Sequence, residues 1–198
     1  GAIFLGGPGT GKTMATACIG NTFKVTSLVG DLGATKSSLV GSSEQRIRRM
    51  MDVIYSLGGE RVMLVATCNK LGIMPPELLR RFSLGIWHFS VPSHEDKKSI
   101  WRIQMAKYDI PARQENPDDS DWVGSDIKNC AEKSWMLGMP LIEAAKFITI
   151  SGRVSAKDIA QLRDLSERSG FLCANHGNES VGEPESRVRV RRQINVGE

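Results

Sequence analysis

A glycine-rich segment near the start of the chain carries the residues best suited to chemistry. Four of its glycines precede Lys12 and Thr13 in the run Gly6-Gly7-Pro8-Gly9-Thr10-Gly11-Lys12-Thr13. Because glycine has no side chain, several backbone N–H groups can approach one anion, and the start of a following helix adds positive potential. The Lys12 ammonium group can bind the β- and γ-phosphates of a nucleotide, and the Thr13 hydroxyl can coordinate the Mg²⁺ that bridges them. This segment, here called the phosphate loop, predicts a nucleoside triphosphate site.

The residues around the phosphate loop predict that it joins a buried strand to a helix. Residues 2–5 are all apolar, and a helix is expected over about residues 11–20. Further strands are predicted in three segments rich in apolar or β-branched residues, namely Lys24–Val29, Arg61–Thr67 and Leu84–Val91. Helices are predicted between these strands, one opening at a capping box on Ser42 and a short one over Glu77–Arg81. This pattern is typical of an α/β core with a parallel sheet between helices.

Beyond Pro92 the pattern predicts helices only. They are expected at roughly residues 94–107, 125–137, 139–149 and 156–168. Trp101, Trp122 and Trp135 fall in or near these helices, where we expect them to anchor a small core. The organisation that follows is an α/β core over residues 1–92, a small all-α lid domain over 93–175 and a flexible tail over 176–198.

Composition restricts the class of protein. The chain has 198 residues, of which 40% are hydrophobic, and it has no apolar run long enough to cross a membrane. The four cysteines are far apart, so neither a disulfide framework nor a zinc site is indicated, and a cytoplasmic location is expected. A net charge of +4 permits a nucleic-acid partner without requiring one. The first residues already form a strand, so we expect a truncated N-terminus.

Five stretches in order resemble the AAA+ ATPases, and more particularly the AAA modules carried by some bacteriophages. They are the phosphate loop, Leu39–Glu44, Ala66–Asn69, Pro75–Phe82 and Trp122–Ile127. The resemblance covers roughly residues 2–175. It implies a P-loop NTPase fold in which the phosphate loop is the Walker A motif, with ATP and Mg²⁺ as cofactors. For a phage-encoded chain, the location would be the host cytoplasm.

The resemblance also implies catalytic roles for three polar residues. Asn69 matches the sensor-1 position, where an amide can orient the attacking water; a turn asparagine at the end of a strand is the alternative. Arg80 and Arg81 match the arginine finger, which acts on the nucleotide of the next subunit, with Arg81 the closer fit. A solvated arginine pair is the alternative for these two residues. The finger implies a ring-like homo-oligomer.

Further positions match the family less closely. Leu39 and Val40 align with the first pore loop, which grips a translocating protein or nucleic acid, although this pair could instead pack in the core or seal a subunit contact. Gly124 and Ser125 match the lid position that approaches the base or ribose. Met14, which directly follows the phosphate loop, completes the predicted nucleotide site.

The sequence departs from the family in the carboxylates that support hydrolysis. Family members carry an Asp-Glu pair, the Walker B motif, on a strand before the sensor-1 strand, and this chain has no room for that strand. Glu60 would stand at the wrong end of a strand, and Asp52 is expected on a solvated helix face. Asp31, at the end of the second strand, is the best candidate. If the Arg61–Thr67 strand itself fills the missing place, Asn69 could hold water but could not accept its proton.

Two functions are therefore predicted from the sequence. The first is an AAA-type ATPase that hydrolyses ATP at subunit interfaces to remodel or translocate a protein or nucleic-acid partner. The alternative is a nucleotide-binding scaffold or switch with little or no hydrolysis. The arginine pair and Asn69 favour the first function, and the missing Walker B carboxylates favour the second.

Overall fold

A computed structural model of the chain describes residues 1–31, 49, 52–54, 56, 62–69 and 82–175. Among these residues, five strands form one sheet, in the spatial order β2-β3-β1-β4-β5, and every neighbouring pair is parallel. The strands are β1 (Ala2–Gly6), β2 (Thr26–Asp31), β3 (Val62–Cys68), β4 (Ile86–Phe89) and β5 (Leu172–Cys173). The helices are α1 (Lys12–Phe23), α4 (His94–Lys107), α5 (Gly124–Leu137), α6 (Leu141–Ala145), α7 (Ser151–Val154) and α8 (Ala156–Ser169).

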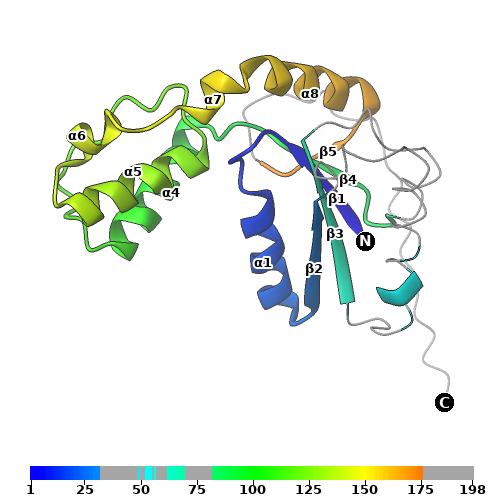
Figure 1. Cartoon of the computed structure of the whole chain (residues 1–198). Coiled ribbons are helices and arrows are strands. Elements are labelled where there is room, and N and C mark those ends of the chain that lie inside the picture. The colour runs from blue at the N-terminus through cyan, green and yellow to red at the C-terminus, as the bar shows by residue number, and fades with distance from the viewer. Residues whose placement is uncertain (32–48, 50–51, 55, 57–61, 70–81, 176–198) are drawn as a thin grey trace.

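Side chains of the two central strands alternate between the two faces of the sheet. On one face Ala2, Phe4 and Val65 pack with Phe89 against helix α1. On the other face the core contains Leu162 of helix α8 together with Ile3, Leu5, Leu64, Ala66 and Cys68. Because both faces of β1 and β3 are covered, these strands are apolar almost throughout. The architecture is the predicted α/β fold, with a parallel sheet covered by helices (Figure 1).

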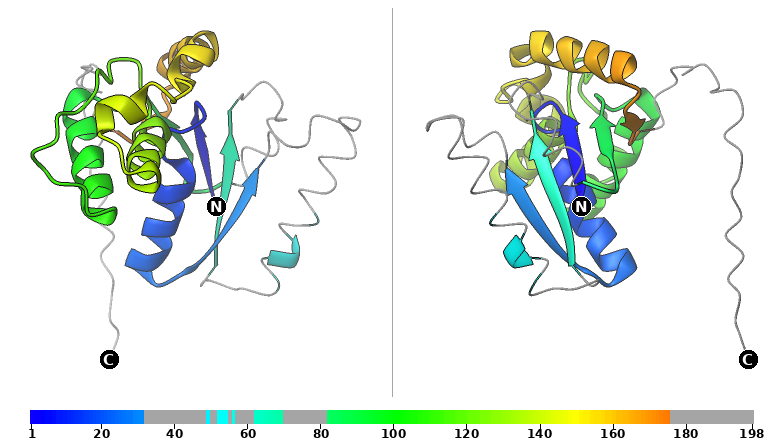
Figure 2. Two further views of the ribbon diagram at one scale, coloured as in Figure 1. Left: turned by 60° about the vertical axis from the view of Figure 1, so that its left-hand side comes forward. Right: turned by 90° about the vertical axis from the view of Figure 1, so that its right-hand side faces the viewer.

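The strand register brings the carboxyl ends of the strands to one edge of the sheet. Leu5 of β1 pairs with Cys68 of β3, and Asp31 of β2 pairs with Thr67. The phosphate loop leaves the same edge, since it directly follows β1. Helix α8 lies above this end of β1 in both views of Figure 2. Its Ile159 approaches the phosphate loop so closely that a Cβ on Gly7 would lie 2.9 Å from Ile159 Cγ1.

Helices α4, α5 and α6 have a core of their own, on the far side of α1 from the sheet (Figure 1). Trp101, Trp122, Ile127 and Leu141 are buried in it. Helix α4 begins at a capping box in which Ser93 and Asp96 bond each other's backbone N–H groups. No helix among the described residues combines the length and the hydropathy needed to cross a membrane.

Three expectations differ from the observed elements. Strand β5 follows the helices and pairs with β4, although the pattern beyond Pro92 predicts helices only. The helix predicted over residues 139–149 is a five-residue helix, α6, because the chain turns at Lys146. Trp135 is 60% exposed and contacts Tyr108 at the surface instead of anchoring the core.

Several predicted features lie outside the described residues. They are the capping box at Ser42, the short helix over Glu77–Arg81, and the tail beyond residue 175.

Candidate functional site

The phosphate loop turns sharply between strand β1 and helix α1. Gly9 and Gly11 have φ values of 80° and 97°, a left-handed conformation that favours glycine. Thr10 Oγ1 donates a hydrogen bond of 2.9 Å to the Gly7 carbonyl oxygen, which closes the turn. Helix α1 then starts at Lys12, so its first N–H groups face the loop. The conformation is that of an anion-binding loop at a helix N-terminus.

Lys12 is buried beneath this loop, with 8% of its surface exposed. Its Nζ atom donates hydrogen bonds to the carbonyl oxygens of Gly6 and Gly7, at 2.8 and 2.7 Å. Burial lowers the pKa of Lys12 to about 8, and the charges of Cys68 and Asp31 partly oppose this shift. The Lys12 ammonium group is therefore preorganised at the loop, and anionic oxygens could replace the two carbonyls that it now contacts.

Helix α5 begins directly against the phosphate loop. Ser125 N donates a hydrogen bond of 3.2 Å to the Gly9 carbonyl oxygen. A Cβ on Gly9 would lie 2.1 Å from Ser125 Oγ, and a Cβ on Gly124 would lie 3.3 Å from Gly9 O. Glycine at position 9 is thus required for this close approach as well as for its positive φ.

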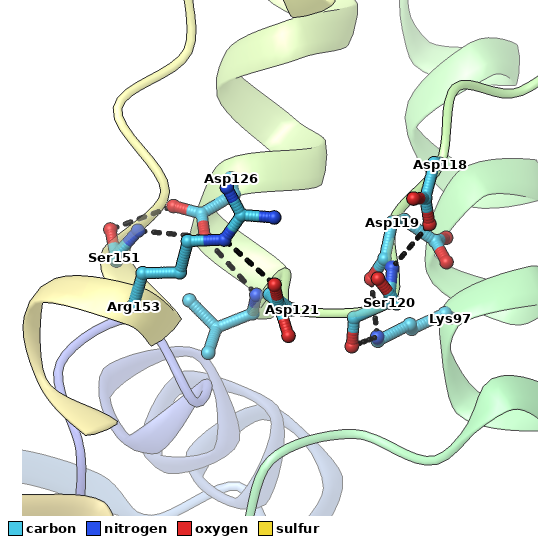
Figure 3. A network of polar contacts seen from close by, with 9 residues as sticks. Lys97, Asp118, Asp119, Ser120, Asp121, Asp126, Ser151 and Arg153 are labelled. Atoms are coloured by element: carbon cyan, nitrogen blue, oxygen red, sulfur yellow. Dashed lines mark hydrogen bonds and ion pairs between the residues drawn. The ribbon is translucent and has the colours of Figure 1, made fainter. Parts of the chain in front are cut away.

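A network of polar contacts fixes the start of helix α5 (Figure 3). Asp126 is fully buried, and its carboxylate accepts hydrogen bonds from Val123 N at 3.2 Å and from Ser151 N at 3.1 Å. Ser151 Oγ donates a third, at 2.7 Å. Beside it, Lys97 Nζ donates to the backbone carbonyl oxygens of Asp119 and Ser120. These contacts hold the residues that precede α5 to helices α4 and α7.

A cleft of about 590 Å³, here called the phosphate-loop cleft, lies between the loop and helices α4 and α5. Its lining includes the predicted residues Gly9, Thr10, Gly11, Lys12, Thr13, Met14, Gly124 and Ser125. Residues that the sequence analysis did not identify also line it, among them Ile100, Ile103, Gln104, Lys128 and Asn175. Their sequence pattern resembles that of any amphipathic helix or turn, so only the tertiary contacts reveal them.

Two other predicted polar residues stand at the same edge of the sheet. Asn69 directly follows β3 and Asp31 ends β2, and both are exposed. The Asp31 carboxylate is near enough to raise the pKa of Lys12. Asp52 is exposed on a helical segment. Arg80, Arg81, Leu39, Val40 and Glu60 lie outside the described residues.

Oxygen donors suited to Mg²⁺ are present on this edge. Thr13 has an exposed hydroxyl at the start of α1, and Asp31 has a carboxylate at the end of β2. Mg²⁺ is bound by one or two such protein oxygens together with phosphate oxygens and water. Within the described part of the chain, no group of three His, Cys, Asp or Glu side chains could hold a metal by itself. These donors fit an ion that is held jointly with a nucleotide.

Comparisons with known proteins agree with this geometry. Residues 2–58 match the family described as "ATPase family associated with various cellular activities (AAA)". The "Uncharacterized AAA domain-containing protein ycf46" of Trieres chinensis is 23% identical over 148 residues, which cover 54% of this chain and 30% of that protein. The "Proteasome-activating nucleotidase" of Sulfurisphaera tokodaii is 29% identical over 146 residues, covering 64% of this chain and 36% of that protein. The chain thus spans about a third of the length of these relatives.

Solved structures share the fold. The crystal structure of the FIGL-1 AAA domain superposes with a TM-score of 0.58 and 15% identity, covering 87% of this chain and 77% of that domain. The same domain in complex with ADP gives a TM-score of 0.51 and 16% identity, covering 87% of this chain and 78% of that domain. At this level of identity the likeness concerns the fold alone.

Proposed function

We propose that this chain is an AAA-type ATPase, which binds ATP in the phosphate-loop cleft and hydrolyses it. Its fold and the match over residues 2–58 support this proposal. The observation that supports this most directly is Lys12, buried beneath two glycine carbonyls at the start of α1. A cation in that position suits the β- and γ-phosphates. The ADP-bound FIGL-1 AAA domain, which shares the fold, supports a nucleotide as the ligand.

In the proposed complex the phosphate loop binds the phosphates through its backbone N–H groups and Lys12. The Lys12 Nζ atom exchanges its bonds with Gly6 O and Gly7 O for phosphate oxygens. Gly124 and Ser125 lie beside the nucleotide, because α5 begins against Gly9. Met14, which is 60% exposed and lines the cleft, contributes apolar surface.

Thr13 and Asp31 are the residues proposed to hold Mg²⁺. When bound, the ion would neutralise charge on the β- and γ-phosphates. Asp31 lies two strands from β1, about 10 Å across the sheet. Its charge already acts on Lys12, which supports its location within reach of the phosphates. We propose that Asp31 supplies the carboxylate that the missing Walker B strand provides elsewhere in the family.

Asn69 and the arginine pair complete the proposed machinery. The Asn69 amide follows β3 at the nucleotide edge of the sheet and would orient the attacking water. Arg80 and Arg81 would stabilise charge on the γ-phosphate of a neighbouring subunit, which requires a ring-like homo-oligomer. Leu39 and Val40 would then grip a protein or nucleic-acid partner in the pore.

A nucleotide-binding scaffold or switch is the second candidate function. It is supported by the absence of an Asp-Glu pair from the sequence, because a single exposed carboxylate at Asp31 is a weaker substitute for two. In this case ATP would set the assembly state and remain largely uncleaved.

Steady-state ATP turnover of the parent chain, Lys12→Ala and Arg81→Ala separates the two functions. An ATPase should turn over ATP in the parent and lose turnover in both variants. Mixing the two variants should restore part of the activity, since some interfaces then combine an intact Lys12 with an intact Arg81. Tight Mg-ATP binding without turnover in the parent would reject hydrolysis and favour the scaffold.

A further inference from the structure

The phosphate-loop cleft extends along helix α4, away from the phosphates. Ile100 lies at the end of the cleft that is near the phosphate loop. A Cβ on Gly124 would lie 3.7 Å from Ile100 Cδ1, and Gly124 itself packs on Gly9 of the loop. Gln104 lies one helical turn further along α4, about 6 Å beyond Ile100, and also lines the cleft. A nucleotide with its phosphates in the loop would therefore direct its base toward this part of α4.

Gln104 has an unusual environment for an amide side chain. Only 6% of its surface is exposed, and its Oε1 atom is buried without a hydrogen-bond partner. Leaving a buried acceptor unpaired is unfavourable, so native proteins seldom do so without a reason. The last torsion of a glutamine is broad, which allows the amide to turn toward a donor in the cleft.

Unpaired acceptors are concentrated at this cleft. Of the three buried side-chain atoms without a partner in the described part of the chain, two belong to its lining, Gln104 Oε1 and Asn175 Oδ1. The Asn175 amide nitrogen donates to Ser90 O, beside the end of β4 and close to the phosphate loop. Asn175 is thus nearer the phosphates, and Gln104 is the acceptor available to the base.

We propose that Gln104 Oε1 accepts a hydrogen bond from the exocyclic 6-amino group of adenine, and that this contact makes the site selective for adenine nucleotides. The inference rests on the proposed nucleotide site. Ile100 and Ile103 supply apolar surface suited to the faces of a purine, while the Gln104 amide supplies one acceptor and donors for its edge. Adenine presents a matching pair, an amino donor beside a ring-nitrogen acceptor.

Guanine fits these groups less well. It has an oxygen in place of the 6-amino group, and its 2-amino group needs a further acceptor. The acidic residue of the lining, Asp96, already accepts hydrogen bonds from Ser93 N and Ser93 Oγ at the start of α4. A guanine base would therefore leave polar groups unpaired in the cleft.

The test combines one change in the protein with one change in the ligand. Binding of ATP and of purine riboside triphosphate, which lacks only the 6-amino group, is measured by calorimetry with the parent and with Gln104→Met. The parent should bind ATP about tenfold more tightly than the analogue. Gln104→Met should bind the two ligands with equal affinity, because the partner of the amino group is gone.

Controls separate the possible failures. Gln161→Met, the same substitution at an exposed position of α8, should retain the parent's preference for ATP. Inorganic tripolyphosphate should bind equally to the parent and Gln104→Met, and failure of the parent to bind it or ATP would reject the nucleotide site itself. Equal binding of ATP and the analogue by the parent would overturn the role of Gln104, even where Gln104→Met does not fold. An ATP preference that persists in Gln104→Met would also overturn it.

Discussion

At the scale of the residue, Lys12 combines burial with a charge that the proposed function needs. Its surroundings replace water by two carbonyl oxygens, and this burial lowers its pKa to about 8. Bound phosphates would favour the ammonium form and raise the pKa again. Binding above pH 8 must therefore be accompanied by proton uptake at Lys12.

Affinity for tripolyphosphate should accordingly fall as the pH rises through 8. Below that value Lys12 is already protonated and the lysine contributes no pH dependence. Above it, affinity should decrease by up to tenfold per pH unit, until the pKa of the bound state is reached. Calorimetric titration at pH 7, 8 and 9 measures this slope. Lys12→Ala should bind weakly with no such slope, and the same slope in that variant would assign the titration to another group.

Asp31 can be tested through Mg²⁺ instead of turnover. Asp31→Asn keeps the shape of the side chain and removes its charge, so ATP affinity in the presence of Mg²⁺ should fall about tenfold. Affinity measured with a chelator should stay equal or rise, because one negative charge near the phosphates is gone. Asp52→Asn, at an exposed helical position, is the matched control. A loss that does not depend on Mg²⁺ would contradict the assignment.

At the scale of the element, the start of helix α5 depends on a single buried carboxylate. Asp126 accepts hydrogen bonds from Val123 N, Ser151 N and Ser151 Oγ, and thereby ties α5 to α7 (Figure 3). The same segment contacts the phosphate loop through Ser125. We therefore expect changes at this helix end to affect both stability and nucleotide affinity.

Asp126→Ala should lower the free energy of unfolding by about 2–4 kcal/mol, because it leaves three donors unpaired, of which Val123 N is buried and the two of Ser151 are half-buried. Urea denaturation measures this loss. Asp118→Ala is the matched control in the neighbouring loop: its carboxylate is exposed and accepts a hydrogen bond from Ser120 N, so its effect should stay within about 0.5 kcal/mol. Similar losses in the two variants would contradict the importance of burial at Asp126.

At the scale of the whole molecule, the phosphate-loop cleft lies between two cores. The phosphate loop and α1 belong to the sheet, whereas α4 and α5 have the separate core around Trp101 and Ile127. A nucleotide bound in the cleft, as proposed, would contact both parts at once. Binding should therefore stabilise the molecule as a unit.

ATP at one hundred times its dissociation constant should raise the free energy of unfolding by about 2.7 kcal/mol. The corresponding shift of the thermal midpoint is measured by scanning calorimetry. Tryptophan fluorescence of a Trp87→Phe variant, which lacks the tryptophan of strand β4, is the second probe and reports on the helical core. Lys12→Ala should show little or no shift at the same ATP concentration. A higher thermal midpoint in calorimetry, with an unchanged midpoint of the tryptophan fluorescence, would contradict a ligand that contacts both parts.

The sequence by itself determines the phosphate loop, strands β1 to β4 and most of the helices. Strands β1 and β3 are apolar almost throughout and α4 begins at a local capping box, so neighbouring residues suffice to predict them. The glycines before Lys12 are equally local, since the turn they form needs no distant contact. The AAA-type fold is expected through resemblance, from short motifs in a fixed order, and the solved structures share it.

Only the tertiary structure decided which distant residues share the cleft. Sheet pairing sets Asp31 beside Thr67. Ser125 contacts Gly9 although the two residues are far apart in the sequence, a contact first expected by resemblance alone. Gln104 has no local signal, because an unpaired buried acceptor is defined by everything that surrounds it. Strand β5 is two residues long and exists only through its pairing with β4. Local patterns specify elements, whereas burial and pairing arise from contacts between residues far apart in the sequence.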